Sequence, residues 1–377
     1  MNYAEESLKL HKDHHGKLEI KSKISVSNKQ ELATAYTPGV GAVSSAIAAQ
    51  PELAKEMTMK RNSVAIVTDG SAVLGLGNLG PLGALPVMEG KAILFKEFSG
   101  IDAFPICLDT QDKEEIIATV KHIAPTFGGI NLEDIAAPLC FEIESRLKAE
   151  LDIPVMHDDQ QGTAVVVLAG LINALKVKGL DKTTAKVIIN GAGAAGIAIA
   201  KMLLSYGFTD LTLCDSKGAI YQDRSDLNEE KQALAKQTNS ALTQGSLTDV
   251  IRGADIFIGV SKPGTLTQDM IKTMNTQPIV FALANPIPEI MPDEAKQAGA
   301  YIVATGRSDF PNQINNVLAF PGIFRGALDN GVIQITPAMF LQAAHNLAAC
   351  VTDPSVDNIL PDPFDKTVVT KVAEAIK

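Results

Sequence analysis

Two adjacent aspartates stand in the middle of the chain, where a short apolar run meets a longer one. The segment 153–170 reads IPVMHDDQQGTAVVVLAG and puts Asp158 and Asp159 at that junction. This order predicts a buried strand, an acidic tip and then a helix. Carboxylates held rigidly at such a junction suit a metal site or an acid–base site. An ordinary helix cap has the same acidic pattern, so partners elsewhere in the chain must decide between the two interpretations.

A second acidic pair, Glu133 and Asp134, follows a diglycine turn. At a turn or a helix start, two neighbouring carboxylates can point at one cation, whereas within a strand they would face opposite sides. Together with one residue of the pair Asp158 and Asp159, they predict three oxygen ligands for a hard divalent ion, Mg²⁺ or Mn²⁺. This set contains no cysteine, which disfavours zinc. The alternative is that both pairs belong to solvated acidic surfaces.

Lys91 and Tyr36 are the candidates for proton transfer. Lys91 begins an apolar run that we expect to be a buried strand, where its ammonium group would be partly desolvated and could pair with the aspartate that the metal leaves free. Tyr36 stands just before the rigid Pro38-Gly39 turn that opens a helix. If this tyrosine faces a cleft, its phenol can give up a proton; otherwise it simply packs.

A dinucleotide-binding pattern opens the second half of the chain. The segment 186–208 reads as an apolar strand, a GxGxxG turn and a helix of small residues, and a second strand ends at Asp215, 19 residues after the last glycine. The residues expected to face the pyrophosphate are Gly191, Gly193, Ala194, Ala195 and Gly196. Asp215 would accept hydrogen bonds from the ribose hydroxyls and repel a 2′-phosphate. This favours NAD over NADP, although Lys217 lies close enough to soften the choice.

The order of patterns predicts an α/β protein with two domains. We expect an N-terminal α/β catalytic domain over residues 1–161 and a Rossmann-type, doubly wound parallel-sheet domain that binds NAD over residues 162–350. Residues 351–377 form a linker and a helix whose docking the pattern does not fix. Ligands of such sheets bind beyond the carboxyl ends of the strands, where Asn285 falls. Asn285 and Asn316 could bind a carboxylate or a nicotinamide carboxamide, although asparagines in loops are more often turn formers.

Composition excludes several classes of partner and indicates a compartment. The formal net charge is -10 and no cluster of lysine and arginine appears, which argues against a nucleic-acid surface. The sequence has no uninterrupted apolar span of about 18 residues, which argues against a membrane helix. The N-terminus lacks the pattern of a signal peptide. We expect a cytoplasmic protein, because the four cysteines stand in apolar contexts without CxxC spacing, as buried free thiols do: Cys107, Cys140, Cys214 and Cys350.

Eight motifs, in one order, make the chain resemble malic enzymes of the short bacterial type. They are YTPGV at 36–40, VTDGSAVLGLGNLG at 67–80, GKAILF at 90–95, ED at 133–134, HDDQQGTA at 157–164, GAGAAG at 191–196, FALANP at 281–286 and NNVLAFPG at 315–322. The match spans nearly the whole chain. It implies oxidative decarboxylation of (S)-malate to pyruvate and CO₂, with reduction of NAD, a requirement for Mg²⁺ or Mn²⁺, and a homodimer.

The resemblance also implies roles for single residues. Tyr36 would be the general acid and Lys91 the general base, with Asp158 beside it. The metal ligands would be Glu133, Asp134 and Asp159, and the contacts to substrate would come from Lys91, Asn285 and Asn316, with Asn285 also near the cofactor. One departure concerns an arginine that binds a substrate carboxylate in longer members. The matching position here, Val73, is apolar, so another cation must hold that carboxylate.

Three alternatives remain at this point. An oxaloacetate decarboxylase on the same scaffold would use the metal and Tyr36 but make little use of the dinucleotide. A malolactic-type enzyme would keep NAD bound and release lactate. A non-catalytic module that senses dinucleotide would not need the metal ligands, so the acidic pairs weigh against it.

Overall fold

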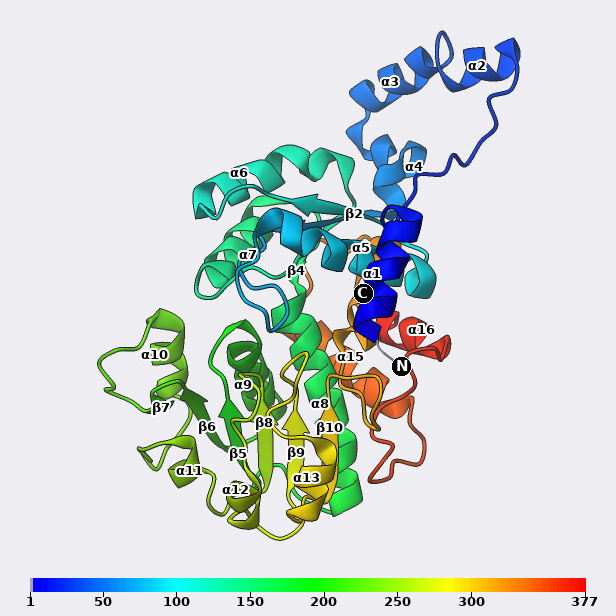
Figure 1. Cartoon of the computed structure of the whole chain (residues 1–377). Coiled ribbons are helices and arrows are strands. Elements are labelled where there is room, and N and C mark those ends of the chain that lie inside the picture. The colour runs from blue at the N-terminus through cyan, green and yellow to red at the C-terminus, as the bar shows by residue number, and fades with distance from the viewer. Residues whose placement is uncertain (1–2) are drawn as a thin grey trace.

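The first half of the chain is built on a four-stranded parallel sheet in the order β2-β1-β3-β4 (Figure 1). The structure, a computed structural model, describes residues 3–377. The strands are β1 (Ser63–Thr68), β2 (Asp102–Cys107), β3 (Gly129–Leu132) and β4 (Val155–His157). Every residue of β1, β3 and β4 is buried, as expected for central parallel strands with both faces covered. Because all four strands run in one direction, their carboxyl ends meet at one edge of the sheet.

Helix α5 (Gly80–Ser99) packs against β1 and β2, and it contains Lys91. The strand expected at Lys91 is therefore wrong. The buried residues of α5 recur mostly at helical spacing: Ala84, Met88, Lys91, Ala92 and Phe95. An apolar run as short as 92–95 does not distinguish a strand from one turn of a buried helix. The other helices of this half are α6 (Lys113–Ile123), η3 (Ala124–Thr126) and α7 (Leu139–Glu150).

Helix α8 (Asp158–Lys178) leads from the first sheet to the second and lies between them (Figure 1). Its residues 164–175 are all buried. By length and composition this helix would pass as a membrane span, but most of its apolar stretch is buried inside the protein, and core helices pass the same test. The domain boundary expected between residues 161 and 162 falls within the first turns of α8, and it stays a prediction.

The second half contains a six-stranded sheet in the order β10-β9-β8-β5-β6-β7. All neighbours are parallel except β6 and β7, and this confirms the predicted Rossmann-type sheet. The strands are β5 (Lys186–Asn190), β6 (Asp210–Asp215), β7 (Gly218–Ala219), β8 (Ile256–Gly259), β9 (Ile279–Ala282) and β10 (Ile302–Thr305). The helices of this half are α9 (Ala194–Tyr206), α10 (Glu229–Ala235), α11 (Leu247–Val250), α12 (Gln268–Lys272) and α13 (Pro292–Gln297).

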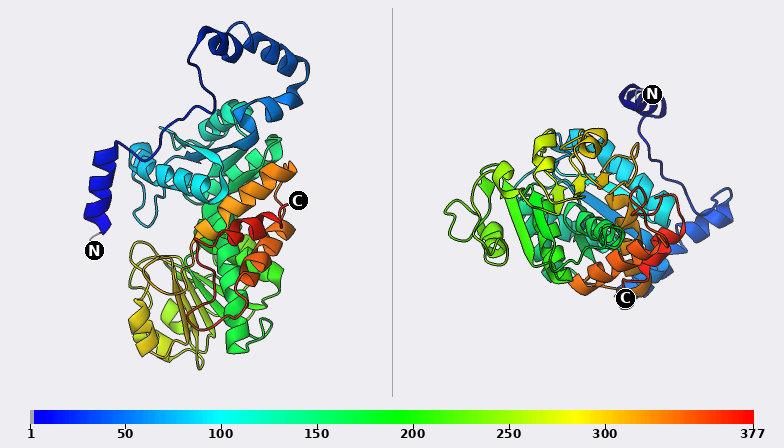
Figure 2. Two further views of the ribbon diagram at one scale, coloured as in Figure 1. Left: turned by 90° about the vertical axis from the view of Figure 1, so that its right-hand side faces the viewer. Right: turned by 90° about the horizontal axis from the view of Figure 1, so that it is seen from below.

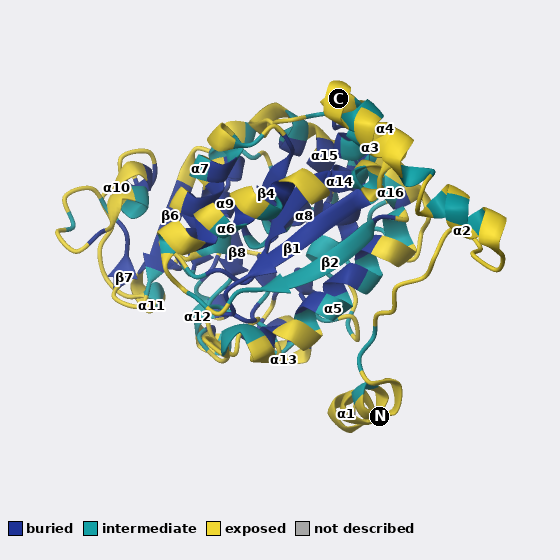
Figure 3. Ribbon diagram, turned by 90° about the horizontal axis from the view of Figure 1, so that it is seen from above, coloured by how far each residue is buried: buried dark blue, intermediate teal, exposed yellow. Residues whose placement is uncertain are grey.

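The C-terminal part of the chain returns to the first sheet. Helix α14 (Phe320–Asn330) follows the short helix η4 (Asn316–Leu318) and packs against α5. The rings of Phe320 and Phe324 lie 4.7 Å and 5.5 Å from that of Phe95, centroid to centroid. Helix α15 (Pro337–Ala349) packs on α8, and α16 (Thr367–Ala373) packs on α14. Seen from above in Figure 3, α8, α14 and β1 form a continuous buried centre.

Residues 29–49 of the N-terminal segment project away from both sheets (Figures 1 and 2). The helices of this segment are α1 (Tyr3–His14), α2 (Lys29–Ala35), α3 (Val40–Ala49), η1 (Pro51–Leu53), α4 (Ala54–Met57) and η2 (Met59–Asn62). None of these helices contains a buried residue. We call residues 29–49, which form α2 and α3, the N-terminal arm.

Candidate active site

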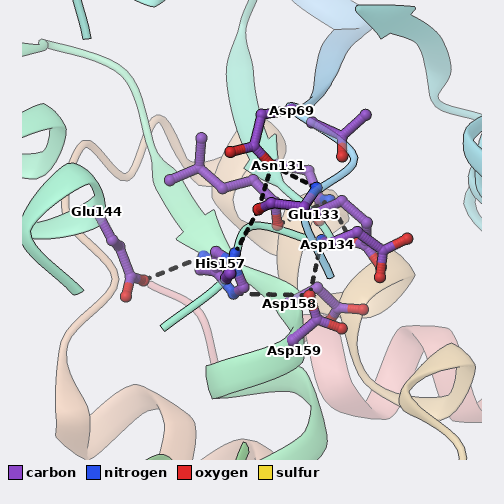
Figure 4. A network of polar contacts seen from close by, with 12 residues as sticks. Asp69, Asn131, Glu133, Asp134, Glu144, His157, Asp158 and Asp159 are labelled. Carbon is purple, nitrogen blue, oxygen red and sulfur yellow. Dashed lines mark hydrogen bonds and ion pairs between the residues drawn. The ribbon is translucent and has the colours of Figure 1, made fainter. Parts of the chain in front are cut away.

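The two acidic pairs meet at the carboxyl edge of the first sheet (Figure 4). Glu133 and Asp134 directly follow β3, and Asp158 and Asp159 directly follow β4. The two strands are parallel neighbours that pair up to Leu132 and His157, so the pairs lie side by side. One carboxylate oxygen from each of Glu133, Asp134 and Asp159 lies within 4.8 Å of the other two. The three predicted metal ligands are therefore brought together by the strand register.

Asp134 shows why these residues fit a cation. It adopts the left-handed backbone conformation, with φ of 53°, and its own N–H donates to Asp159 Oδ2 at 2.8 Å. Its Oδ1 accepts from the Leu74 N–H at 3.3 Å, while its buried Oδ2 has no partner. Burial, together with the charge of Asp159, raises the pKa of Asp134 to about 7. A hard divalent ion would relieve both the crowded negative charge and the orphaned oxygen.

Lys91 projects from α5 into this cluster. Its ammonium donates to Glu133 Oε1 at 2.5 Å and to Asp158 Oδ2, and it lies 4.3 Å from the centroid of the Phe320 ring. Burial by itself would lower the pKa of Lys91, but the charges of Asp158 and Glu133 outweigh burial, and the net pKa is raised. The lysine thus keeps its proton as long as these carboxylates are ionised, and burial raises the pKa of the Glu133 carboxyl well above its ordinary value.

Asp158 is fully buried at the N-terminus of α8. Burial raises its pKa to about 6 in spite of the nearby Lys91 ammonium. The Asn316 amide acts on the same carboxyl and lowers its pKa. Gly162, one turn along α8, allows this approach, because a Cβ there would lie 1.8 Å from Asp158 Oδ1 and 3.4 Å from Asn316 Cβ. The structure thus brings Lys91, Asp158 and Asn316 together, as the sequence analysis expects of neighbours in one site.

Sequence reasoning missed three residues of the cluster. Asn131 donates from Nδ2 to Glu133 Oε2 at 2.8 Å and so fixes this carboxylate. The strand period of two, which puts Asn131 and Glu133 on one side, would have found it. His157 is fully buried, and its backbone N–H donates to Glu144 Oε1 at 3.1 Å (Figure 4). Glu144 lies on α7, and no sequence signal links that helix to β4.

Tyr36 is the predicted residue that the fold does not bring to the cluster. It is the C-terminal cap of α2 and is 64% exposed. The N-terminal arm that carries it projects from the body of the chain in both views of Figure 2. Within one chain, Tyr36 therefore stands in solvent and not beside Lys91.

Asn285 and the glycine-rich loop connect the two halves of the molecule. Asn285 follows β9, at the carboxyl edge of the second sheet. A Cβ at Gly75 would fall 1.8 Å from the Asn285 carbonyl oxygen, so glycine is required for this close approach. Val73, in the same loop, is fully buried.

The predicted dinucleotide turn has the shape that a pyrophosphate needs. Gly191 has φ of 120°, and a Cβ on Gly196 would lie 1.8 Å from the Gly191 carbonyl oxygen. A Cβ on Gly193 would meet no atom within 4 Å, so open space lies before the N-terminus of α9, which begins at Ala194 without a side-chain cap. Free backbone N–H groups and the helix dipole can meet phosphate there. Asp215 ends β6 as predicted, where it pairs with Arg224 and Lys231.

Comparison with known proteins agrees with this geometry. Residues 15–148 match the family description "Malic enzyme, N-terminal domain", and residues 160–377 match "Malic enzyme, NAD binding domain". The chain is 57% identical to the bifunctional malic/malolactic enzyme of Bacillus subtilis (strain 168), over 100% of this chain and 92% of that protein. It is also 57% identical to an NAD-dependent malic enzyme of Geobacillus stearothermophilus, over 96% of this chain and 76% of that protein.

A solved structure has the same fold over almost the whole length. The NAD-dependent malic enzyme of Thermotoga maritima superposes with a TM-score of 0.95 at 49% identity, covering 98% of each chain. The family descriptions, the relatives and the solved structure all match the chain that holds the carboxylate cluster and the dinucleotide turn. This chain therefore belongs to the malic enzyme family.

Proposed function

We propose that the chain oxidatively decarboxylates (S)-malate to pyruvate and CO₂ and reduces NAD in a reaction that requires Mg²⁺ or Mn²⁺. The observation that carries this proposal is the buried contact of Lys91 with Asp158 and Glu133, directly beside the ligand set that Asp134 and Asp159 complete. A proton acceptor, a cation site and a dinucleotide turn on adjoining sheet edges are what this reaction needs.

Lys91 takes the proton of the C2 hydroxyl while hydride leaves C2 for the nicotinamide. This step gives oxaloacetate, loss of CO₂ leaves the enolate of pyruvate, and a proton returned to C3 completes the reaction. A divalent ion held by Glu133, Asp134 and Asp159 would supply the Lewis acid that stabilises negative charge on the substrate oxygens. Lys91 must be neutral to act. A divalent ion held by Glu133, Asp134 and Asp159 would take up part of the negative charge that raises the pKa of Lys91, and so would favour its neutral form.

Tyr36 supplies the proton to C3 in this proposal, and it does so in the site of a second copy of the chain. Three observations support a homodimer joined through the N-terminal arm. The arm has no buried residue, it stands apart from the site of its own chain, and it exposes apolar side chains such as Leu32 and Val43. A second copy would cover these groups and complete the site.

Absorbance at 340 nm tests the main proposal. The purified protein is mixed with malate, Mn²⁺ and either NAD or NADP, and pyruvate is assayed alongside. Reduced cofactor and pyruvate should appear in equal amounts. If no cofactor is reduced but oxaloacetate is lost in a metal-dependent way, the chain is a decarboxylase and the oxidation step is wrong.

A malolactic reaction is the second candidate, and one observation favours it. The Bacillus subtilis relative, which matches the whole chain, is named as a bifunctional malic/malolactic enzyme. A lactate assay in the same mixture distinguishes the reactions. Lactate without net cofactor reduction indicates that the chain keeps its dinucleotide bound and returns the hydride to pyruvate.

A further inference from the structure

A hollow of about 390 Å³ lies between the two halves of the molecule, and none of the residues that line it is assigned above to metal, substrate or dinucleotide. Its walls come from α7 and α8 on one side and from α9, α10 and α15 on the other. Its volume falls in the range of about 300–1,000 Å³ that is typical of sites for small molecules. Gln160, which lines the hollow, leaves α8 about 200° around the helix from Asp158, so the hollow faces away from the catalytic groups.

Much of the lining is apolar and comes from both halves of the molecule. The main apolar residues are Phe141, Ala198, Met202, Ile335, Phe340 and Leu341. All of them except Leu341 are buried. A ligand with an apolar body would leave water here and pack against two aromatic rings, as ligands do in most small-molecule sites.

Gln160 provides a hydrogen-bond donor without a partner. Its side chain is part of the lining, the residue is only 5% exposed, and its Nε2 has no acceptor. A buried amide group that makes no hydrogen bond costs free energy, and an oxygen atom of a ligand in the hollow would remove that cost. The ligand should therefore present an acceptor to this amide.

Two lysines add positive charge to the lining. Lys148 Nζ lies 2.6 Å from Glu144 Oε1, and Lys201 Nζ lies 2.6 Å from Glu230 Oε2. Glu144 also accepts from the backbone N–H of His157 at 3.1 Å, which fixes the partner of Lys148. Each lysine has one ion pair in the part of the chain that the structure describes, so each ammonium keeps two N–H donors for a ligand. The spare polar groups are thus mainly donors, and a carboxylate is their complement.

We propose that this hollow binds a small carboxylate with an apolar body, at a site separate from the catalytic one. The Gln160 amide and the spare donors of Lys148 and Lys201 bind the carboxylate oxygens, and the apolar side chains cover the body. Because both halves contribute to the lining, the bound ligand holds α7 against α9 and α15. This inference goes beyond the proposed function and does not depend on it.

A pair of probes tests the carboxylate requirement. 3-Phenylpropionate and 3-phenylpropan-1-ol share an apolar body and differ in the carboxylate, and calorimetry gives the Kd of each without metal, malate or dinucleotide. The wild-type chain should bind the carboxylate about tenfold more tightly than the alcohol. Equal affinity overturns the proposal. So does the lack of saturable binding of the carboxylate up to about 10 mM, which would also be the result if a second copy of the chain covered the hollow.

Two variants test whether the probe binds in this hollow. Gln160→Leu keeps a similar shape without the amide and should weaken 3-phenylpropionate about tenfold. Lys201→Ala should weaken it about threefold, and this variant should fold because its pair with Glu230 is at the surface. The matched control is Lys272→Ala, which breaks an exposed pair with Asp269 on α12 and should leave the Kd unchanged.

A wild-type Kd in both the Gln160 and the Lys201 variants would mean that the probe binds elsewhere, and the proposal would be wrong. The probes report on the hollow alone. If they bind as expected while malate is not turned over, the proposed function is wrong and this inference stands.

Discussion

The three carboxylates of Glu133, Asp134 and Asp159 repel one another in a space that one cation would fill. Binding of Mn²⁺ to the native state should therefore raise Tm. When the ion is at 100 times its Kd, the free energy of unfolding should increase by about 2.7 kcal/mol. Differential scanning calorimetry after treatment with a chelator measures this shift. Asp134→Asn should remove most of it, whereas Asp269→Asn, an exposed site, should keep it. An unchanged shift in the Asp134 variant would exclude this residue as a ligand.

Lys91 is the only cation bonded to the buried Asp158 and Glu133 carboxylates within the described residues. The Lys91→Ala variant leaves both buried carboxylates without a bonded cation. We expect its free energy of unfolding to fall by about 3–5 kcal/mol in the absence of metal. Turnover should be lost, while calorimetry should still show dinucleotide binding. Lys96→Ala is the matched control, because this exposed lysine of the same helix pairs with Asp102 and should cost less than about 1 kcal/mol. Turnover by the Lys91 variant would refute the role of general base.

Cys214 gives a pH dependence of stability. Burial raises the pKa of this thiol to about 12, above the ordinary value of about 8.5 that it regains on unfolding. The folded state therefore holds the proton more tightly, and stability falls as pH rises from 8.5 to 12. At pH 10 the loss due to this thiol is about 2 kcal/mol. Urea unfolding at pH 8 and pH 10 should show a smaller decrease for Cys214→Ala than for wild type, and equal decreases would contradict the assignment.

At the scale of elements, the contact of α14 with α16 depends on glycine. A Cβ on Gly326 would lie 2.5 Å from the Ala373 carbonyl oxygen and 2.8 Å from Ile376 Cβ. Gly326→Ala should thus cost about 1–3 kcal/mol in the free energy of unfolding, measured in urea. Gly90→Ala in α5 is the control, because its nearest neighbour is the flexible Lys17 Nζ at 3.4 Å. Equal stability of the two variants would mean that α16 shifts to make room.

The strands that carry the acidic pairs could be predicted because their ends are visible in the sequence pattern. Apolar runs end directly at Glu133 and at Asp158, so the strand ends and the site appear together in the sequence. The secondary structure at Lys91 was harder to predict, because the apolar run after it is too short to distinguish helical from strand periodicity. The ion pairs of Asp215 lie beyond prediction from the pattern. Arg224 and Lys231 reach it from residues 9 and 16 positions later, through loop geometry that no spacing rule encodes.

At the scale of the whole molecule, the N-terminal arm decides how many chains make one site. The sequence identifies Tyr36 as a candidate acid but cannot tell whose site it serves, because that depends on where the arm folds. The proposed homodimer makes a specific prediction for mixed variants. Tyr36→Phe and Lys91→Ala proteins, each inactive alone, are unfolded together, refolded and assayed at 340 nm.

Random pairing makes half of the dimers mixed, and each mixed dimer has one complete site if Tyr36 acts across the interface. The mixture should therefore regain about a quarter of the wild-type turnover. If Tyr36 served its own chain, every site would lack one residue and no activity would return. Refolding each variant alone is the control, and sedimentation of both confirms that dimers form.

Helix α8 has a consequence for protein engineering. It carries Asp158 and Asp159 at its first turn, yet its body is buried against the second half of the molecule, and α14 brings the chain back to the first sheet. Neither half of the molecule can therefore be replaced by that of a relative simply by joining the two sequences at the start of that half. A chimera with a relative of different cofactor preference should exchange only residues 179–315. Helices α8 and α14 then stay with the parent chain and keep their packing contacts. Such a graft would transfer the adenosine end of the site without disturbing a single carboxylate of the metal cluster.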